Sequence, residues 1–260
     1  MKFNSATTSA DDSPGAASPV RTLVLLCTYN EAANLPRVFE LLGQHLPTAE
    51  ILVVDDNSPD GTAQVVDDLR AASSDRGPMV HLLRREGKLG LGTAIRDGLL
   101  WCLERDYDFV ICMDADLSHN PTAAPQLLAV CTQVDTAVDV AVGSRYVPGG
   151  GFDGLAWHRR FISRALNGYA TRLLRLPVKD CSGSYRCYRT ATLRKLDFNQ
   201  LTCVGYGFLE ELLVALYRRG AVLVEVPIRF QNRTEGYSKL GLRDIWGAIR
   251  VIHRLAIRNN

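Results

Sequence analysis

The chain has 260 residues, of which 47% are hydrophobic and 22% charged, a composition typical of a globular protein with one full core. Its formal net charge of +2 gives no support for nucleic-acid binding. No run approaches the ~18–20 consecutive apolar residues that span a bilayer, which excludes a transmembrane helix. The seven cysteines, an odd number without zinc-like spacing or a secretory signal, favour a reducing cytoplasm.

Apolar runs alternate with segments of helical periodicity along most of the chain. Residues 1–19, rich in Ser, Ala, Asp, Thr and Pro, predict a disordered leader. After this leader the sequence predicts strands over residues 22–27, 51–54, 80–83, 109–113 and 138–142, and helices over residues 30–45, 62–72, 91–105 and 121–131. Because the strands are uniformly apolar and alternate with helices, we expect an α/β fold. Its sheet should be mostly parallel and covered by helices on both faces, in a single domain over residues 20–260.

Two later segments combine apolar residues at helical spacing with many arginines. Residues 148–151, Pro-Gly-Gly-Gly, predict a flexible loop, and residues 157–176 and 241–258 predict basic amphipathic helices. Such helices suit an anionic membrane surface, so the sequence predicts peripheral association with a membrane. A surface helix packed on the sheet would show the same pattern, and this alternative stays open.

Two carboxylates, Asp114 and Asp116, follow the apolar run at residues 109–113. Two charges this close at a strand end must be solvated, paired or bound to a metal. A hard divalent cation would resolve their repulsion and leave room for substrate phosphates, whereas a solvated turn is the alternative. The other predicted strands also end in polar residues, and ligands bind at the carboxyl ends of parallel strands. The pattern therefore predicts a site at this edge of the sheet.

Six motifs, in order along the chain, resemble those of a known family. They are residues 27–31 (CTYNE), 54–62 (VDDNSPDGT), 87–94 (GKLGLGTA), 113–119 (MDADLSH), 143–146 (GSRY) and 236–240 (GYSKL). Together they resemble glycosyltransferase family 2 and, within it, the short dolichol-phosphate (polyprenol-phosphate) mannosyltransferases without C-terminal transmembrane helices. The resemblance covers roughly residues 20–258, and six ordered motifs are far more specific than any one alone.

This resemblance implies a GT-A fold, with an acceptor loop and amphipathic helix over residues 145–176 and a second amphipathic helix over residues 241–258. It implies inverting transfer of mannose from GDP-mannose to dolichyl or polyprenyl phosphate, which gives polyprenyl phosphate β-mannose. It further implies Mg²⁺ or Mn²⁺ as cofactor and a place at the cytoplasmic face of a membrane, with attachment either through small membrane anchor subunits or through the chain's own basic helices. A UDP-sugar-dependent polyprenyl-phosphate glucosyltransferase, another family-2 glycosyltransferase and a non-catalytic nucleotide-sugar binder are the alternatives.

The resemblance also implies roles for individual residues. It places the metal on Asp114 and Asp116, and the acceptor phosphate on Arg145, Arg159 and Ser163. The implied donor-binding residues are Thr28, Tyr29, Glu31, Asp55, Asp56, Lys88, Asp114, Ala115, Asp116, Arg233 and Lys239. Asp116, Arg145 and Arg159 are the implied catalytic residues.

Three further positions carry weaker expectations. Ser118 stands where some relatives have a glutamine metal ligand, and its hydroxyl is a weaker ligand. Asp180 and Glu210 match acidic positions near the acceptor side and at a helix start, although Glu210 also fits a favourable N-terminal helix charge. Residues 87–92 are rich in glycine but lack the Gly-Lys-Ser/Thr ending of a P-loop. This excludes an ATPase and favours a loop whose backbone approaches the donor.

Overall fold

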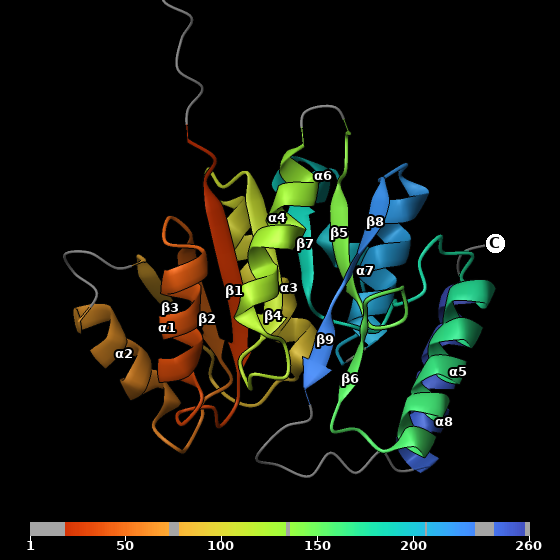
Figure 1. The fold of residues 1–260 in the computed structure, drawn as a ribbon, viewed down its shortest axis with the longest axis horizontal. Helices are drawn as coiled ribbons and strands as arrows, with labels where there is room; N and C mark the ends of the chain where they lie inside the picture. Colours follow the sequence, from red (N-terminus) through yellow and green to blue (C-terminus); the bar gives the residue numbers. More distant parts are fainter. Residues whose placement is uncertain (1–18, 73–77, 134–135, 206, 232–241, 258–260) are drawn as a thin grey trace, which may run out of the picture.

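The computed structural model describes residues 19–72, 78–133, 136–205, 207–231 and 242–257. Within these residues a seven-stranded sheet forms the centre of the molecule (Figure 1), in the order β3-β2-β1-β4-β7-β5-β8. Its strands are β1 (Thr22–Thr28), β2 (Glu50–Asp55), β3 (Val80–Arg84), β4 (Phe109–Asp114), β5 (Val140–Ser144), β7 (Arg186–Arg189) and β8 (Leu223–Pro227). Neighbouring strands are parallel except at β7, which runs antiparallel to both β4 and β5. The expected mostly parallel sheet is confirmed.

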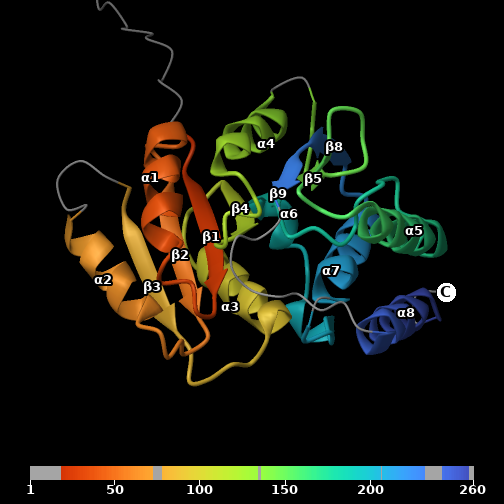
Figure 2. The same cartoon turned by 60° about the horizontal axis from the view of Figure 1, so that its bottom comes forward.

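Helices cover both faces of this sheet (Figure 2), as the sequence predicted. On one face lie α1 (Leu35–His45), α2 (Thr62–Ala72) and α4 (Ala124–Thr132), and on the other α3 (Leu91–Leu103), α6 (Thr190–Leu193) and α7 (Gly207–Arg218). The connections contain the 3-10 helices η1 (Pro121–Ala123) and η2 (Phe198–Gln200) and the parallel pair β6 (Gly151–Asp153) and β9 (Arg229–Gln231).

The centre of the sheet is apolar on both faces because alternate residues of a strand point to opposite sides. In β1, Leu23 and Leu25 belong to the core that contains α3 and α7, whereas Val24 and Leu26 belong to the core that contains α1 and α4. All four side chains are at most 1% exposed. This burial on two sides explains why the strand is a continuous apolar run in the sequence.

The two basic helices, α5 (Trp157–Leu173) and α8 (Leu242–Ile257), lie side by side at one end of the molecule (Figure 1, Figure 2). Ala170 in α5, and Ile252 and Leu255 in α8, join the core that contains α7. Helices therefore occupy most of both predicted segments, although α5 ends at Leu173 and not at residue 176, and both helices pack on the body of the protein. Among the described residues, no helix has the length and apolar character to cross a membrane.

Some predicted boundaries were wrong. The helix expected from residue 30 begins at Leu35, after a turn at residues 32–34. Asn30 itself has a left-handed backbone with φ of 62°, which a right-handed helix excludes. The strand expected over residues 138–142 occupies Val140–Ser144, and the expected loop at residues 148–151 runs into β6. β7, β8 and β9 were not predicted. The leader expected at residues 1–19 lies outside the described residues, except for residue 19.

Gly98 lets α3 pack closely against the sheet. A Cβ atom there would lie 2.4 Å from Leu25 Cδ1 and 3.1 Å from Val54 Cγ2. Gly98→Ala is therefore expected to lower the free energy of unfolding by about 1–3 kcal/mol, because overpacking outweighs the better helix propensity of alanine. Gly168→Ala in α5 is the control, since a Cβ atom there meets nothing within 4 Å. In urea unfolding, the free energy of unfolding of this control should rise by about 0.5–1 kcal/mol. Similar effects of both variants would contradict close packing of α3 against the sheet at Gly98.

Candidate functional site

The carboxyl ends of β1, β2 and β4 meet at one edge of the sheet, and the chain turns sharply after each strand. Asn30, Asn57 and Leu117 adopt a left-handed backbone in these turns, with φ of 62°, 57° and 62°. Asparagine tolerates this conformation, whereas for leucine it costs roughly 1–2 kcal/mol. Strained backbone of this kind clusters at functional sites. The polar residues that follow these strands therefore share one edge, as the sequence predicted.

The carboxylate of Asp55, at the end of β2, accepts hydrogen bonds from neighbouring residues of the protein. Its Oδ1 accepts hydrogen bonds from Thr28 Oγ1 at 2.9 Å and Ser58 Oγ at 2.5 Å, and its Oδ2 accepts one from Ser58 N at 3.0 Å. The residue is only 1% exposed. Thr28 and Asp55, both predicted to bind the donor, thus bind one another and fix the turn after β2.

Asp56 forms a buried ion pair with Arg85, a residue that sequence reasoning missed. Asp56 Oδ2 also accepts the Gly90 N–H at 3.0 Å, and Arg85 donates to Thr93 Oγ1 at 2.7 Å. The pair therefore ties the end of β2 to the start of α3. An arginine after a strand is usually a solvated charge, and nothing in the local pattern indicated that Arg85 would be buried.

Gly92, in the glycine-rich stretch, has a packing reason that the sequence did not indicate. A Cβ atom on Gly92 would lie 2.5 Å from the backbone oxygen of Gly205. Gly92 therefore allows α3 to approach the segment that precedes α7, and the expected approach of this stretch to the donor stays a prediction.

Three predicted donor residues keep accessible side chains at the edge. Tyr29 is 36% exposed, and the Lys88 ammonium lies 3.8 Å from the centroid of its ring. This distance is within the range of a cation–π interaction. Glu31 is half-buried, and its Oε2 accepts a hydrogen bond from Asn34 Nδ2 at 2.7 Å.

Asp114 and Asp116, at the end of β4, are held by polar neighbours. Ser184 Oγ donates to Asp114 Oδ1 at 2.7 Å, and Ser118 N donates to Asp116 Oδ1 at 2.9 Å. Asp114 N lies 3.1 Å from His119 Nδ1 and donates to it. Burial lowers the pKa of His119, which keeps its ring neutral and able to accept this bond. The Asp114 side chain is 25% exposed, so it faces the edge more openly than Asp116.

This pair offers the oxygen ligands that a hard cation prefers. Ser118 Oγ is buried beside it and has no hydrogen-bond partner among the described residues, whereas the Ala115 side chain is buried in the core. No group of three His, Cys, Asp or Glu side chains is suited to a metal ion in the described part of the chain. A cation here would therefore take further ligands from water and substrate phosphates, as Mg²⁺ usually does. Asp114 and Asp116 therefore fit a divalent cation that completes its coordination with water and substrate phosphates.

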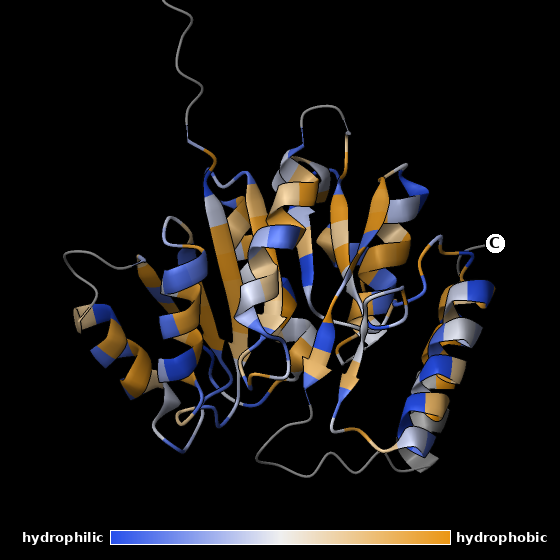
Figure 3. Cartoon of the chain, in the orientation of Figure 1, coloured by the Kyte–Doolittle hydropathy of each residue, from blue (hydrophilic) through white to orange (hydrophobic). Residues whose placement is uncertain are grey.

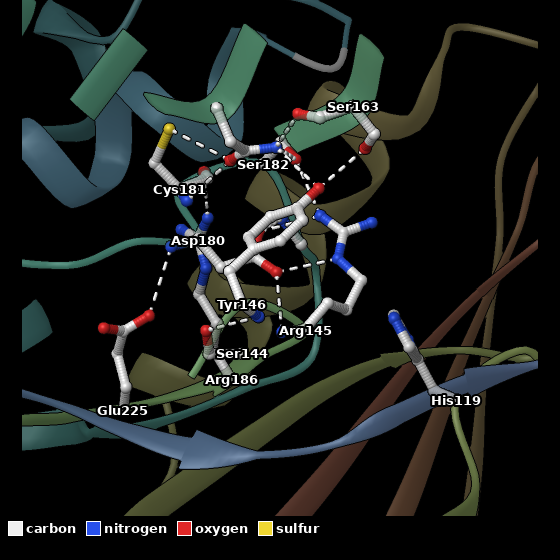
Figure 4. Close-up of polar contacts among 12 residues, drawn as sticks. His119, Ser144, Arg145, Tyr146, Ser163, Asp180, Cys181, Ser182, Arg186 and Glu225 are labelled. Carbon is white, nitrogen blue, oxygen red and sulfur yellow. Dashed lines mark hydrogen bonds and ion pairs between the residues drawn. The ribbon is translucent and has the colours of Figure 1, made fainter. Parts of the chain in front are cut away.

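Arg145, directly after β5, is anchored by Asp180 (Figure 4). Its Nε and Nη2 each donate to the Asp180 carboxylate at 2.7 Å, and Nη2 also donates to Ser182 Oγ at 2.8 Å. Burial opposes the charge on Asp180, but Arg145 holds the pKa of Asp180 below its ordinary value. The Nη1 group of Arg145 makes no hydrogen bond to a described residue. This edge of the guanidinium can therefore bind a second anion.

Ser163 joins the same network through Tyr146. Ser163 Oγ lies 2.6 Å from the Tyr146 hydroxyl, and Asn167 Nδ2 donates to that hydroxyl at 3.2 Å and to Ser182 Oγ at 3.0 Å. Figure 4 shows Tyr146, Ser163 and Ser182 around Arg145. The structure therefore brings together two of the three residues predicted to bind the acceptor phosphate.

The loop at residues 180–184 connects the two halves of the site. Its first residue, Asp180, holds Arg145, and its last, Ser184, holds Asp114. Arg159, the third predicted acceptor residue, lies exposed in the first turn of α5. The predicted donor residues Arg233 and Lys239 lie outside the described residues.

Glu210 is buried near the start of α7. Burial raises its pKa to about 7, and neighbouring Arg186 only partly offsets this effect. Glu210 Oε2 has no hydrogen-bond partner among the described residues. The carboxyl group is therefore at the interior of the fold, and a favourable N-terminal charge on an exposed helix end does not describe it.

This raised pKa makes stability depend on pH. An acid whose pKa is raised on folding stabilises the fold below its unfolded pKa, and this stability is lost as the pH rises through the folded value. Glu210→Gln is therefore expected to be about 2–3 kcal/mol more stable than wild type at about pH 8, and within about 1 kcal/mol at about pH 5. Urea unfolding across this range measures the difference. Glu104→Gln, at an exposed position, is the control. If the free energies of unfolding of wild type and Glu210→Gln change in parallel with pH, the raised pKa of Glu210 is contradicted.

Comparison with known proteins places the chain among glycosyltransferases. Residues 23–197 match the family described as glycosyl transferase family 2. Over 250 residues the chain is 40% identical to the polyprenol monophosphomannose synthase of Mycolicibacterium smegmatis, covering 96% of this chain and 92% of that relative. Over 221 residues it is 42% identical to the undecaprenyl-phosphate mannosyltransferase of Micrococcus luteus, covering 85% and 88%.

Solved structures share the fold at lower identity. A mannosyltransferase from Pyrobaculum calidifontis in complex with GDP-Man and Mn²⁺ is 16% identical, with a TM-score of 0.64 over 92% of this chain and 65% of that one. Glucosyl-3-phosphoglycerate synthase from Mycobacterium tuberculosis, with Mn²⁺, UDP and its product, is 18% identical, with a TM-score of 0.64 over 92% and 80%. These similarities confirm the GT-A fold. The family match over residues 23–197 and the two relatives of 40% and 42% identity show that the chain belongs to glycosyl transferase family 2.

Proposed function

We propose that this chain transfers mannose from GDP-mannose to a polyprenyl phosphate, with inversion at the sugar carbon. The observation that carries this proposal is 40% identity, over 96% of the chain, to a relative named for polyprenol monophosphomannose synthesis. A second relative, 42% identical, is named for mannosyl transfer to undecaprenyl phosphate. The paired carboxylates and the anchored Arg145 at one edge of the sheet support the same reaction class.

Asp114 and Asp116 are the residues that we propose to hold Mg²⁺ or Mn²⁺ against the donor diphosphate. When bound, such a cation supplies the positive charge that stabilises the departing nucleoside diphosphate. Ser184 and the backbone of Ser118 orient the two carboxylates for this task. Ala115 can contribute only through its backbone, because its side chain is buried.

The nucleoside is proposed to lie against the loops after β1 and β2. Tyr29, beside the Lys88 ammonium, offers an aromatic face for stacking, and Glu31 offers a carboxylate for hydrogen bonds. Thr28, Asp55 and Asp56 are proposed to border this surface, and both carboxylates also accept hydrogen bonds within the protein.

The acceptor phosphate requires positive charge more than it requires a general base. A phosphate monoester is largely ionised near neutral pH, so its oxygen can attack the sugar carbon while the bond to the nucleoside diphosphate breaks. We propose that Arg145, through its Nη1 edge, binds this phosphate with Arg159 and Ser163 on the face opposite the leaving group. Attack from that face inverts the sugar carbon and gives the β-linked product. Arg233 and Lys239 are proposed to contact the donor phosphates.

Because the proposed acceptor is a lipid, we propose that the enzyme works at the cytoplasmic face of a membrane as a peripheral protein. The basic helix α5, with exposed aromatic side chains, supports this placement. Small membrane subunits are proposed as additional anchors, and isolation of a tagged chain from membranes would reveal them.

Parallel transfer assays separate the two donor classes. The purified chain is incubated with undecaprenyl phosphate in detergent, Mg²⁺ or Mn²⁺, and radiolabelled GDP-mannose or UDP-glucose. The proposal predicts label in the organic phase from GDP-mannose alone. Label from UDP-glucose alone would support the alternative, a polyprenyl-phosphate glucosyltransferase, and would overturn the assigned donor.

A further inference from the structure

A cation-lined pocket lies on α5, separate from the edge of the sheet. Its volume is about 440 Å³, and the residues that matter to its chemistry are Tyr146, Phe161, Arg164, Gly168, Arg172 and Lys179. Phe161, Arg164, Gly168 and Arg172 follow one another at helical spacing along one side of α5, and Lys179 belongs to the segment that leads to Asp180.

The three cations of this pocket have no anionic partner. Arg164, Arg172 and Lys179 form no hydrogen bond or ion pair with a described residue, and no acidic residue lines the pocket. Two buried arginines of this fold are by contrast paired, Arg145 with Asp180 and Arg85 with Asp56. Three uncompensated charges around one hollow attract an anion with several oxygens, and a phosphate group matches this arrangement.

An exposed aromatic side chain, Phe161, lines the same pocket, and a second one lies one turn away on α5. Phe161 is 70% exposed, and Trp157, one turn earlier on α5, is 79% exposed. Figure 3 shows hydrophobic and hydrophilic residues mixed along this helix. Large aromatic residues beside basic ones are typical of helices that lie in a membrane interface, where the rings enter the lipid and the cations meet the headgroups. A free phosphate ion would use the cations but would leave these rings in water.

From these observations we infer that the α5 pocket binds the phosphate headgroup of an anionic membrane lipid, with Phe161 and Trp157 inserted beside it. The pocket is distinct from the proposed acceptor site, because its three cations are not those placed around the acceptor phosphate. Tyr146 borders both, since its hydroxyl contacts Ser163 while the residue also lines the pocket. The inference rests on the proposed placement at a membrane, but it requires neither the donor nor the transfer reaction.

Vesicle sedimentation tests the charges of the pocket. The full chain is mixed with vesicles of phosphatidylcholine alone, or of phosphatidylcholine and phosphatidylglycerol in equal parts. The double variant Arg172→Gln/Lys179→Gln is expected to lose roughly tenfold or more of its affinity for the anionic vesicles. The control Lys195→Gln/Arg219→Gln removes the same charge from exposed positions outside the pocket, and it should lose much less. Equal losses would show a diffuse charge effect and overturn the inference.

A neutral substitution tests the shape of the pocket. Gly168 lies in its lining, and a Cβ atom there meets nothing within 4 Å, so Gly168→Gln can fill the pocket without disturbing the fold. This variant should also lose affinity for anionic vesicles at unchanged net charge, whereas binding equal to wild type would contradict a defined site.

Two further readouts identify the occupant. Transfer to undecaprenyl phosphate in detergent should be unchanged in all these variants, and a selective loss in the pocket variants would assign the pocket to the acceptor instead. Inorganic phosphate at millimolar concentration should compete weakly with the vesicles. Saturable binding of inorganic phosphate without any preference for anionic vesicles would identify a free-phosphate site and overturn the lipid assignment.

Discussion

Asp116→Asn is expected to lower kcat/KM for sugar transfer by roughly a thousandfold or more, because it removes one of the two carboxylates that we propose to hold the divalent cation. The side chain of Asn is nearly isosteric, and the hydrogen bond from Ser118 N to Oδ1 can be kept by its amide oxygen. We therefore expect the free energy of unfolding to change by no more than about 1 kcal/mol. Steady-state transfer kinetics and urea unfolding measure the two effects separately.

Asp68→Asn provides the matched control for this substitution. Asp68 is on α2, where it accepts a hydrogen bond from Gln64 at 2.9 Å, and it should retain wild-type kcat/KM. Activity of Asp116→Asn within a few-fold of wild type would contradict the metal site. If Asp116→Asn loses activity because it unfolds, the loss is no evidence for a catalytic role, and the prediction that its stability is nearly unchanged is wrong.

Asp180→Asn is expected to destabilise the fold by about 3–5 kcal/mol, since it leaves the Arg145 guanidinium without its carboxylate in a buried site. Asp180 is fully buried, and the Arg145 side chain is 11% exposed. The exposed pair of Asp153 and Arg229 is the matched control. Asp153→Asn should leave stability nearly unchanged, because water screens that pair.

A double variant distinguishes the lost charge pair from a local distortion. In the Asp180→Asn background, Arg145→Gln removes the uncompensated cation and should restore part of the lost stability. Additive losses for the two substitutions, measured by urea unfolding, would show that the ion pair does not carry the effect. Because Asp180 positions Arg145, Asp180→Asn should also raise KM for the polyprenyl phosphate more than KM for the donor.

The first half of the fold was predictable because its signals are local. Strands β1 to β4 are continuous apolar runs, and their helices show regular periodicity, so the positions of these strands along the chain and their parallel direction followed from the sequence alone. β7 gave no such signal: its four residues, Arg-Cys-Tyr-Arg, look polar, although Arg186 is fully buried and donates to the backbone oxygens of Cys181 and Leu209. Its place in the sheet depends on contacts between distant segments.

In the candidate site, too, the residues with a local sequence signal were predictable and those that depend on distant contacts were not. The carboxylates at residues 114 and 116 were recognisable from their position after an apolar run, and Arg145 from its place after another strand. The partner of Arg145 lies 35 residues away at Asp180, and the partner of Asp56 lies 29 residues away at Arg85. No local pattern encodes such pairs, so the sequence did not indicate that Asp55 and Asp56, which the family resemblance places at the donor, are also bonded within the protein.

The central claim is tested most directly by transfer of radiolabelled mannose from GDP-mannose to undecaprenyl phosphate, with wild type and Asp116→Asn measured side by side, with metal and after chelation. Our account predicts label in the organic phase that requires wild-type protein and Mg²⁺ or Mn²⁺, and that is abolished by chelation and in the variant. Our account would be contradicted if folded wild-type protein transfers no mannose. It would also be contradicted if neither chelation nor the Asp116→Asn substitution lowers the transfer.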